Sequence, residues 1–342
     1  MPTVEQLSDL VTLTLAELGE MKITDNMLPL RNYVAASEVM KKSRMTVESG
    51  DSIEFSYAYQ DSGAAKHTQI GETDTVNMVP LAVRGSLPWR FSTTNYFFDT
   101  REQAMNSGKR RIFDVIKLRR AGSIASWYGL AESTFWSKPT DSTDTKTPFG
   151  VDYWITGYSG TPGFQGGNPT GFSSGRAGID SSTYPRFKNW AGTYTSITRA
   201  DLVAKLRKAS YSTGFQSPLN LPEYRTGTDY GYYTTYDVVS TLETIVEGQN
   251  ENLGNDVAAK DGTVLFRGNK VVAVPYLTEN TSTNPIYGID WGTFKTVVKS
   301  GEWMNESKPI TPPYRHREVI IYVDFQYNFV CYDPRRNFKL NQ

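Results

Sequence analysis

The chain has 342 residues and a mass of 38.4 kDa, enough for two medium domains or one elaborated fold with a sizeable core. Its 36 Lys and Arg residues balance 36 Asp and Glu residues, which excludes a global charge that would draw the protein to nucleic acid or membrane. A single cysteine excludes an intramolecular disulfide framework. The sequence contains no run of about 18 uncharged apolar residues, so we expect no membrane span.

The N-terminal residues predict an acidic helix over 3–19 with one apolar face. Thr3 and Gln6 have capping-box spacing, and apolar residues recur on one side of the helix. Across residues 1–30, five acidic residues outnumber a single lysine. Because a helix this short needs a partner surface to be stable, we expect this segment to be an arm that packs against another surface.

Residues 45–84 predict a long two-stranded hairpin. Apolar and aromatic residues occupy odd positions on both sides of the polar segment 61–74, which is the alternation of a β-strand. The tip, near residues 62–71, contains Lys66 and His67. Because isolated two-stranded ribbons are marginally stable in water, we expect a neighbouring subunit to cover this hairpin.

A single very long helix is predicted over 99–131, with Asp99 or Thr100 as its cap. Gly108 and Gly122 interrupt it, each at a cost of about 1 kcal/mol relative to Ala, and are the expected hinges. Basic residues spread round most of its circumference, which suits an element with several partners, either neighbouring subunits or DNA. These residues are Arg101, Lys109, Arg110, Arg111, Lys117, Arg119 and Arg120.

The central part of the chain mixes loops with shorter elements. Residues 137–196 are rich in Gly, Ser, Thr, Pro and aromatic residues, and we expect an ordered surface insertion there. Helices are predicted after Thr198 and over 236–248. The stretch "TVLFRGNKVVAVPYL" (263–277) predicts a hairpin with its turn at Gly268-Asn269.

The C-terminal segment contains the clearest strand. Seven consecutive odd positions from Val319 to Cys331 are apolar or aromatic, which predicts a strand of roughly 43 Å, nearly as long as the helix. Cys331 lies within this apolar stripe, so we expect a packed small hydrophobic residue rather than a nucleophile.

No recognisable catalytic or cofactor motif is present. The two histidines, His67 and His316, have no metal-ligand partners at diagnostic spacing, so we expect no metal, no cofactor and no enzyme activity. One alternative class stays open, a β-rich carbohydrate-binding protein or glycosidase that uses aromatic platforms such as Trp154 or Trp190. Paired carboxylates for glycoside hydrolysis come together only in three dimensions, so the sequence does not exclude them.

The order of these parts resembles the major capsid protein of tailed double-stranded DNA bacteriophages, which has the α+β Hong Kong 97 fold. The hairpin "TVLFRGNKVVAVPYL" and the closing strand "VIIYVDFQYNFVCYDPRRNF" are similar to segments of that family. The resemblance implies an N-terminal arm (1–44), an extended two-stranded loop (45–98), a peripheral domain with the spine helix (99–230), an axial domain (231–314) and a returning C-terminal strand (315–342).

The resemblance also implies the function. Copies would assemble into pentamers and hexamers of an icosahedral shell in the host bacterial cytoplasm, and the shell would enclose double-stranded DNA in the virion. A separately encoded scaffolding protein, a portal and, in some relatives, a decoration protein are the implied partners. Some relatives form a Lys to Asn isopeptide cross-link, and Lys66 is the one position that resembles its lysine. An encapsulin-type nanocompartment shell is the alternative within the same fold.

Overall fold

The computed structural model describes residues 33–36, 44–48, 50–73, 79–99, 101, 109–215, 230–247, 264–314 and 317–342. Of residues 109–117, 246 and 247 it describes the backbone alone. The chain divides into two compact units, the first made of residues 1–31, 92–129 and 304–325, the second of residues 32–91, 130–303 and 326–342. The predicted N-terminal helix lies outside the described residues.

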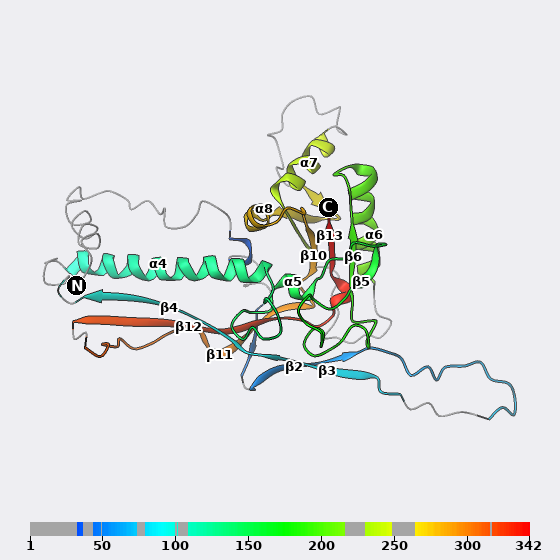
Figure 1. The fold of residues 1–342 in the computed structure, drawn as a ribbon, viewed down its shortest axis with the longest axis horizontal. Coiled ribbons are helices and arrows are strands. Elements are labelled where there is room, and N and C mark those ends of the chain that lie inside the picture. The colour runs from blue at the N-terminus through cyan, green and yellow to red at the C-terminus, as the bar shows by residue number, and fades with distance from the viewer. Residues whose placement is uncertain are drawn as a thin grey trace. The chain divides into compact units, whose positions relative to one another are not determined.

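The first unit contains most of one long strand and of one long helix, together with parts of two further strands. They are β4 (Arg90–Asp99), α4 (Lys109–Trp136), β11 (Phe294–Glu306) and β12 (Glu318–Cys331), and each also extends into the second unit (Figure 1). The strands form a four-stranded sheet in the order β1-β11-β12-β4, in which β1 is Arg44–Val47. Trp127 of α4 stacks on Phe325 of β12, with 3.9 Å between ring centroids. Large apolar rings therefore fasten the helix to the sheet.

The long helix and the long C-terminal strand are both confirmed, with differences at their ends. The helix continues to Trp136, five residues beyond the predicted end. Asp99 closes β4, and its carboxylate accepts a hydrogen bond from the Arg101 backbone N–H at 2.8 Å, as an N-cap does. Residues 102–108, including Gly108, lie outside the described part of the chain.

Two strands differ from the sequence-based expectation. Met45 and Val47, assigned above to the hairpin, lie in β1, which pairs in parallel with β11 (Thr46 opposite Val298). Residues 90–99 form β4, a strand that the sequence did not reveal because polar and aromatic residues occur there without clean alternation. Pairing with a distant strand, rather than local pattern, places both segments in the sheet.

The second unit contains a seven-stranded mixed sheet. Its order is β5-β6-β13-β10-β7-β9-β8, and the pairs β6/β13 and β7/β9 are parallel while the others are antiparallel. The strands are β5 (Gly163–Gly166), β6 (Asn189–Thr193), β7 (Tyr230–Thr234), β8 (Leu265–Phe266), β9 (Asn269–Ala273), β10 (Ile286–Asp290) and β13 (Phe338–Asn341).

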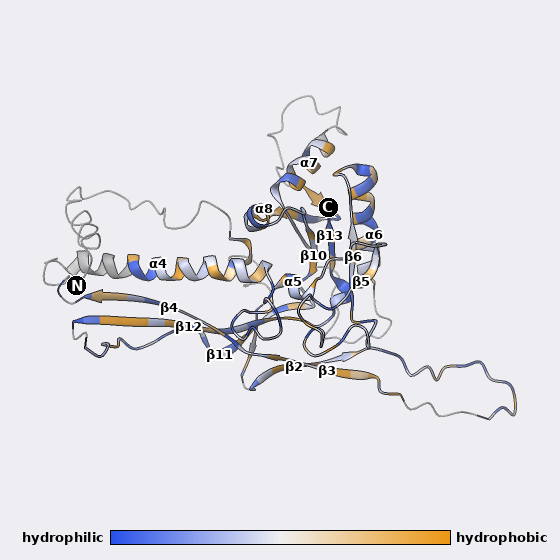
Figure 2. Ribbon diagram, viewed as in Figure 1, coloured by the Kyte–Doolittle hydropathy of each residue, from blue (hydrophilic) through white to orange (hydrophobic). Residues whose placement is uncertain are grey.

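Both faces of this sheet are covered, because successive side chains of a strand point to opposite faces. On one face, Tyr232, Phe338 and Ile286 pack with apolar side chains of α6 (Ala204–Thr213) and α7 (Tyr236–Glu247). On the other, Tyr233 and Tyr287 contact the ring of Trp136. Hydrophilic and hydrophobic residues both occur along α6 and α7 (Figure 2).

Residues 137–196 are ordered, as expected, but they are not a surface insertion. They supply β5, β6 and the short helix α5 (Val151–Trp154). Their large aromatic residues, Tyr153, Trp154, Trp190 and Tyr194, are each no more than 2% exposed. A stretch that looks like a glycine-rich loop in sequence therefore contributes much of the aromatic core.

The remaining short elements agree closely with the sequence. Helix α7 matches the prediction, and Thr198 caps a π-helical turn (Arg199–Val203) that leads into α6, with its side chain accepting from the Asp201 N–H. The β8–β9 turn falls one residue earlier than predicted, at Arg267-Gly268. Both residues have left-handed backbone angles, with φ of 50° and 81°, which a two-residue type I′ turn requires. Residues Pro275–Asn280 form α8, not strand.

A buried carboxylate ties the N-terminal part of the second unit to α4. Glu132 is 1% exposed and accepts hydrogen bonds from the backbone N–H of Ala35 at 2.7 Å and of Ala36 at 3.3 Å. The indole N–H of Trp136 donates to its other oxygen at 2.8 Å. Burying a carboxylate costs free energy unless hydrogen-bond donors surround it. The three donors to Glu132 therefore hold residues 35 and 36 against α4. Among the described helices, none is both long enough and apolar enough to cross a membrane.

A first prediction concerns the acid that starts α6. The Asp201 carboxylate pairs with Lys205 at 2.6 Å and accepts from the Ser196 and Thr195 N–H groups at 2.9 and 2.7 Å, which lowers its pKa to about 2. A carboxylate with a lowered pKa stabilises the folded state above its unfolded pKa of about 3.9, and this contribution disappears as the pH falls toward 2. We expect Asp201→Asn to lower the unfolding free energy at pH 6 by about 0.3–1 kcal/mol, because a negative charge near a helix N-terminus and an exposed ion pair are lost.

Urea denaturation of both proteins at pH 6 and pH 3 measures this effect. The difference between them should be smaller at pH 3, because Asp201 is then partly protonated in the unfolded chain. An equal difference at both pH values would contradict the assigned role of the carboxylate.

A second prediction concerns close packing in the seven-stranded sheet. A Cβ at Gly288 would lie 2.1 Å from Cε1 of Phe338, whose side chain is 0% exposed. Gly288→Ala should therefore lower the unfolding free energy by about 1–3 kcal/mol. Gly129→Ala is the control, since a Cβ there meets nothing within 4 Å and α4 should gain about 0.5–1 kcal/mol. Denaturation of dissociated subunits measures both, and destabilisation of equal size would contradict the packing argument.

Candidate assembly interface

The extended hairpin is the most distinctive surface feature of the second unit. Strand β2 (Ser52–Ala58) pairs with β3 (Ala82–Pro88) in antiparallel register, with Phe55 opposite Gly85. The ring of Phe55 covers Gly85, where an added Cβ would lie 2.7 Å from its Cζ. The sequence correctly predicted a two-stranded hairpin, although its strands are shorter than expected and its connection is longer.

One face of the hairpin carries a row of three aromatic side chains, each with a partner in the body of the unit. The ring of Phe55 contacts Tyr332 edge-on, with centroids 5.7 Å apart. The other two, Tyr57 and Tyr59, contact Phe187 and Tyr184, in both cases with centroids 4.8 Å apart. Edge-to-face aromatic pairs contribute about 0.5–1.5 kcal/mol each beyond their buried area. The odd-numbered aromatic residues of the predicted strand therefore attach the hairpin.

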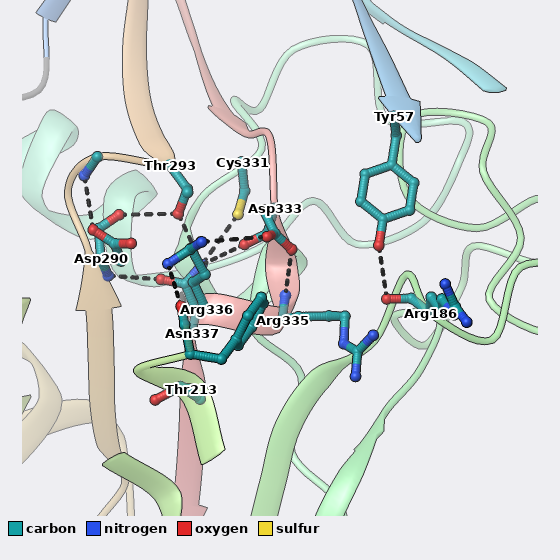
Figure 3. A network of polar contacts seen from close by, with 12 residues as sticks. Tyr57, Arg186, Thr213, Asp290, Thr293, Cys331, Asp333, Arg335, Arg336 and Asn337 are labelled. Carbon is teal, nitrogen blue, oxygen red and sulfur yellow. Dashed lines mark hydrogen bonds and ion pairs between the residues drawn. The ribbon is translucent and has the colours of Figure 1, made fainter. Parts of the chain in front are cut away.

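Two hydrogen bonds complete this attachment. The Tyr57 hydroxyl donates to the Arg186 carbonyl oxygen at 2.9 Å, and burial raises the pKa of this phenol, so it remains a donor at neutral pH (Figure 3). The Ser86 backbone N–H donates to the Ala177 carbonyl oxygen at 3.1 Å. The expectation that only a neighbouring subunit would cover the hairpin is therefore wrong for its base, which the loop around residues 177–187 covers.

The loop that receives Ser86 is fixed by a buried arginine. Arg176 and Ile179 exchange backbone hydrogen bonds across a tight turn in which Ala177 has a left-handed φ of 54°. Arg176 is 1% exposed, and its Nη2 donates to the carbonyl oxygen of Gly167 at 2.6 Å and to Asn189 Oδ1 at 2.8 Å. Burial lowers its pKa to about 10, which still leaves the guanidinium charged at neutral pH. Nothing in the sequence indicated that this arginine is structural.

The tip of the hairpin is exposed, as the sequence predicted. Lys66 lies there and its ammonium group contacts Glu72 Oε1 at 3.3 Å, while Gln69 N–H donates to Glu72 Oε2 at 3.1 Å. His67 is also exposed, and Ile70 is fully exposed at 107% relative accessibility. Single exposed apolar side chains are ordinary on protein surfaces, so Ile70 is a position to test by mutation and does not by itself mark an interface. The cross-linking role of Lys66 stays a prediction.

The basic residues of the long helix are only partly described. Arg120 binds Glu306 through Nε at 2.7 Å and also through Nη2, and this hydrogen bonding raises the pKa of the guanidinium. Arg119 donates to the carbonyl oxygen of Phe97 at 2.9 Å and lies over that ring. Arg101 lies 3.9 Å from an oxygen of Asp99. These three therefore have contacts within their own unit.

Four more of the basic residues named above, and Gly122, belong to α4. Lys109, Arg110, Arg111 and Lys117 have only their backbone described, as part of α4. Gly122 lies inside α4, which is continuous through it. The roles of all seven basic residues in contacts between subunits or with DNA, and of both glycines as hinges, remain predictions.

A polar network that the sequence did not indicate lies at the end of β12 (Figure 3). Asn337 is 0% exposed, accepts from the Asp290 N–H at 2.8 Å, and donates to the Asp333 carbonyl at 3.1 Å and to Cys331 Sγ at 3.3 Å. Cys331 is 0% exposed and burial raises the pKa of its thiol well above the usual value, which makes it a poor nucleophile. The prediction that Cys331 is a packed small residue is confirmed.

The aromatic residues named for carbohydrate stacking are not available to a ligand. Trp154 is 0% exposed and donates its indole N–H to the Phe329 carbonyl at 3.0 Å, while Trp190 is 1% exposed within the core. The suggestion that Trp154 or Trp190 forms an aromatic platform for carbohydrate is therefore wrong. No group of three or more His, Cys, Asp or Glu side chains suited to a metal ion occurs within the described ranges, and His316 lies outside them.

A third prediction concerns the attachment of the hairpin. Phe55→Ala removes the ring that contacts Tyr332 and covers Gly85, so the hairpin should detach more often from the loop beneath it. We expect backbone amides of 52–58 and 82–88 to exchange with deuterium at least about tenfold faster, consistent with a loss of a few kcal/mol. Tyr57→Phe, which keeps the ring and removes one hydrogen bond, should have a smaller effect. Unchanged exchange in Phe55→Ala would contradict this attachment.

Solved structures of other proteins share the fold of this chain. No protein-family model and no curated protein matches the sequence. Among solved structures, the chain is similar to the capsid of Cyanophage A-1(L), with a TM-score of 0.62, 13% identity and coverage of 96% of this chain and 98% of that chain. It is also similar to the capsid of a native GTA particle, with a TM-score of 0.60, 11% identity and coverage of 95% and 96%.

A further similar structure is the capsid of the Myoviridae phage XM1, with a TM-score of 0.54, 8% identity and coverage of 95% of this chain and 96% of that chain. At such low identity the likeness concerns the path of the backbone and not individual residues. The likeness nevertheless extends over nearly all of each chain. The chain therefore has the α+β fold of phage capsid proteins.

Proposed function

We propose that this chain is a major capsid protein, a non-enzymatic structural protein that assembles with copies of itself into a closed shell. The observation that carries the proposal is the likeness to capsid structures over at least 95% of this chain and 96% of those chains. Such coverage leaves no large additional domain in this chain to which a different activity would be assigned. The proposal matches the expectation drawn from the sequence.

The extended hairpin supports the proposal on physical grounds. Its base is held by aromatic contacts within the unit, while its tip presents an exposed Ile70 and the Lys66–Glu72 pair. A projecting tip of this kind is exposed in the subunit alone. In a shell, the tip can bury its apolar side chain against a neighbouring copy.

The finer features of the shell are part of the same proposal. Pentamers and hexamers would close into an icosahedral virion shell around double-stranded DNA, assembled in the host bacterial cytoplasm, with the Hong Kong 97 division into arm, extended loop, peripheral domain and axial domain. A separate scaffolding protein, a portal and an optional decoration protein are the proposed partners. An encapsulin-type compartment would have the same kind of fold, and neighbouring genes distinguish the two, since portal and terminase genes accompany a phage capsid.

Expression and electron microscopy test the proposal. The full chain, alone and together with the products of adjacent genes, should form closed shells of uniform size. A chain that remains a monodisperse monomer under all these conditions would contradict a capsid function.

A fourth prediction tests the hairpin tip. Ile70→Asp replaces a fully exposed side chain, so the unfolding free energy of the subunit should stay within about 0.5 kcal/mol of the original. Shell formation should fall strongly, because a charge would have to be buried at each repeated contact. Ile70→Val is the matched control and should assemble normally. Electron microscopy and sedimentation measure the yield of shells, and normal assembly of Ile70→Asp would remove the tip from the interface.

A further inference from the structure

The segment that forms α6 and the π-helical turn before it is strongly basic. Residues 199–213 contain four Lys or Arg residues and one acidic residue, Asp201. Asp201 is paired with Lys205 across one helical turn. Among the residues that the structure describes, Arg207 and Lys208 form no ion pair. A local positive charge therefore remains on this segment, although the whole chain is neutral.

The basic residues lie on the solvent side of α6. The helix buries Leu206, Ala209 and Thr213, which face the core of the second unit. Arg207, Lys208 and Tyr211 are exposed, the last at 73%. Since residues three and four apart are neighbours on a helix, Tyr211 lies beside both cations. The outer face of α6 thus combines two positive charges with an exposed aromatic ring.

The β8–β9 turn adds a third cation to this face. The guanidinium carbon of Arg267 lies 3.8 Å from the centroid of the Tyr211 ring, and its Nη1 donates to Ser210 Oγ at 2.9 Å. The left-handed turn at Arg267-Gly268 brings the side chain over the helix. Stacking and hydrogen bonding hold the guanidinium in place before any ligand binds, which lowers the entropic cost of binding.

From this geometry we infer that Arg207, Lys208, Tyr211 and Arg267 form a binding surface for the phosphate backbone of nucleic acid. This inference rests on the proposed function, in which the shell encloses DNA. A guanidinium fork matches two phosphate oxygens, and the Tyr211 ring holds the Arg267 guanidinium in place for such a contact.

The surface also differs from the long basic helix. Arg119 and Arg120 of α4 are engaged by Phe97 and Glu306 within their own unit. Arg207 and Lys208 are exposed on α6, and Arg267 is an exposed residue whose Nη1 donates to Ser210 Oγ. These cations are therefore better placed than Arg119 and Arg120 to bind an external polyanion.

Binding of a short fluorescein-labelled DNA duplex by dissociated full-length subunits tests the inference. Fluorescence anisotropy across a series of salt concentrations gives the affinity and its salt dependence. The variant Arg207→Gln/Lys208→Gln/Arg267→Gln should bind at least about tenfold more weakly at low salt, and the slope of log K against log salt should become shallower by about 1 for each phosphate that the variant no longer binds. Arg186→Gln, an exposed arginine of the same unit outside this surface, should bind like the original chain.

A second pair of variants isolates the ring. Tyr211→Ala removes the support of Arg267 and should weaken binding by several-fold, whereas Tyr211→Phe keeps the stacking and should bind normally. Far-ultraviolet circular dichroism establishes that each variant is folded, and because Arg267→Gln alone changes only an exposed side chain, it provides the comparison if the triple variant unfolds.

Unchanged affinity and salt slope in the triple variant would overturn the inference, as would competition by polyglutamate as effective, charge for charge, as competition by DNA. The outcome is separable from that of the proposed function. Shells that form normally while the variants bind DNA unchanged would refute this surface alone. Subunits that bind DNA through it but never form shells would refute the capsid proposal.

Discussion

A two-stranded ribbon has no sheet of its own to lie on, and this constraint shapes the second unit. Strands β2 and β3 bury too little apolar area to be stable alone. The aromatic contacts of Phe55, Tyr57 and Tyr59 with the body of the unit bury the apolar face of the ribbon. Since those aromatic side chains occupy every second residue, the hairpin can be attached along one face while its tip remains exposed.

The attachment requires the receiving loop to be rigid, and buried polar groups provide that rigidity. Arg176 binds carbonyl oxygens of a glycine-rich stretch, and Asn337 and Asn189 each bind several groups at 0% exposure. Each of these buried hydrogen bonds favours the arrangement in which it forms, because breaking it would leave a buried donor or acceptor without a partner. Residues 137–196 can therefore be rich in glycine and still form a well-defined part of the core.

Charge is distributed locally in this protein rather than globally. The chain as a whole is neutral, yet Arg119 and Arg120 on α4 serve contacts within the unit, while α6 keeps its cations on the outside. A neutral subunit can pack many copies together without long-range repulsion, and local positive surfaces can still bind polyanions at short range. The long basic helix is the most conspicuous charged segment of the sequence, but burial and pairing decide which cations remain available.

The sequence by itself determined the elements whose pattern is local: the alternation of β12, the apolar face of α7, the odd-numbered aromatic residues of the hairpin and the great length of α4. It also predicted that Cys331 is buried. Only the tertiary structure decided which segments pair across long distances, as for β1 and β4, and which polar residues of β12 are buried. Asn328, for example, lies at an outward position of the alternation but binds Phe149 N–H and the Pro88 carbonyl. Periodicity reports only which face of its own strand a side chain occupies, whereas a second covering layer comes from residues far away in the chain.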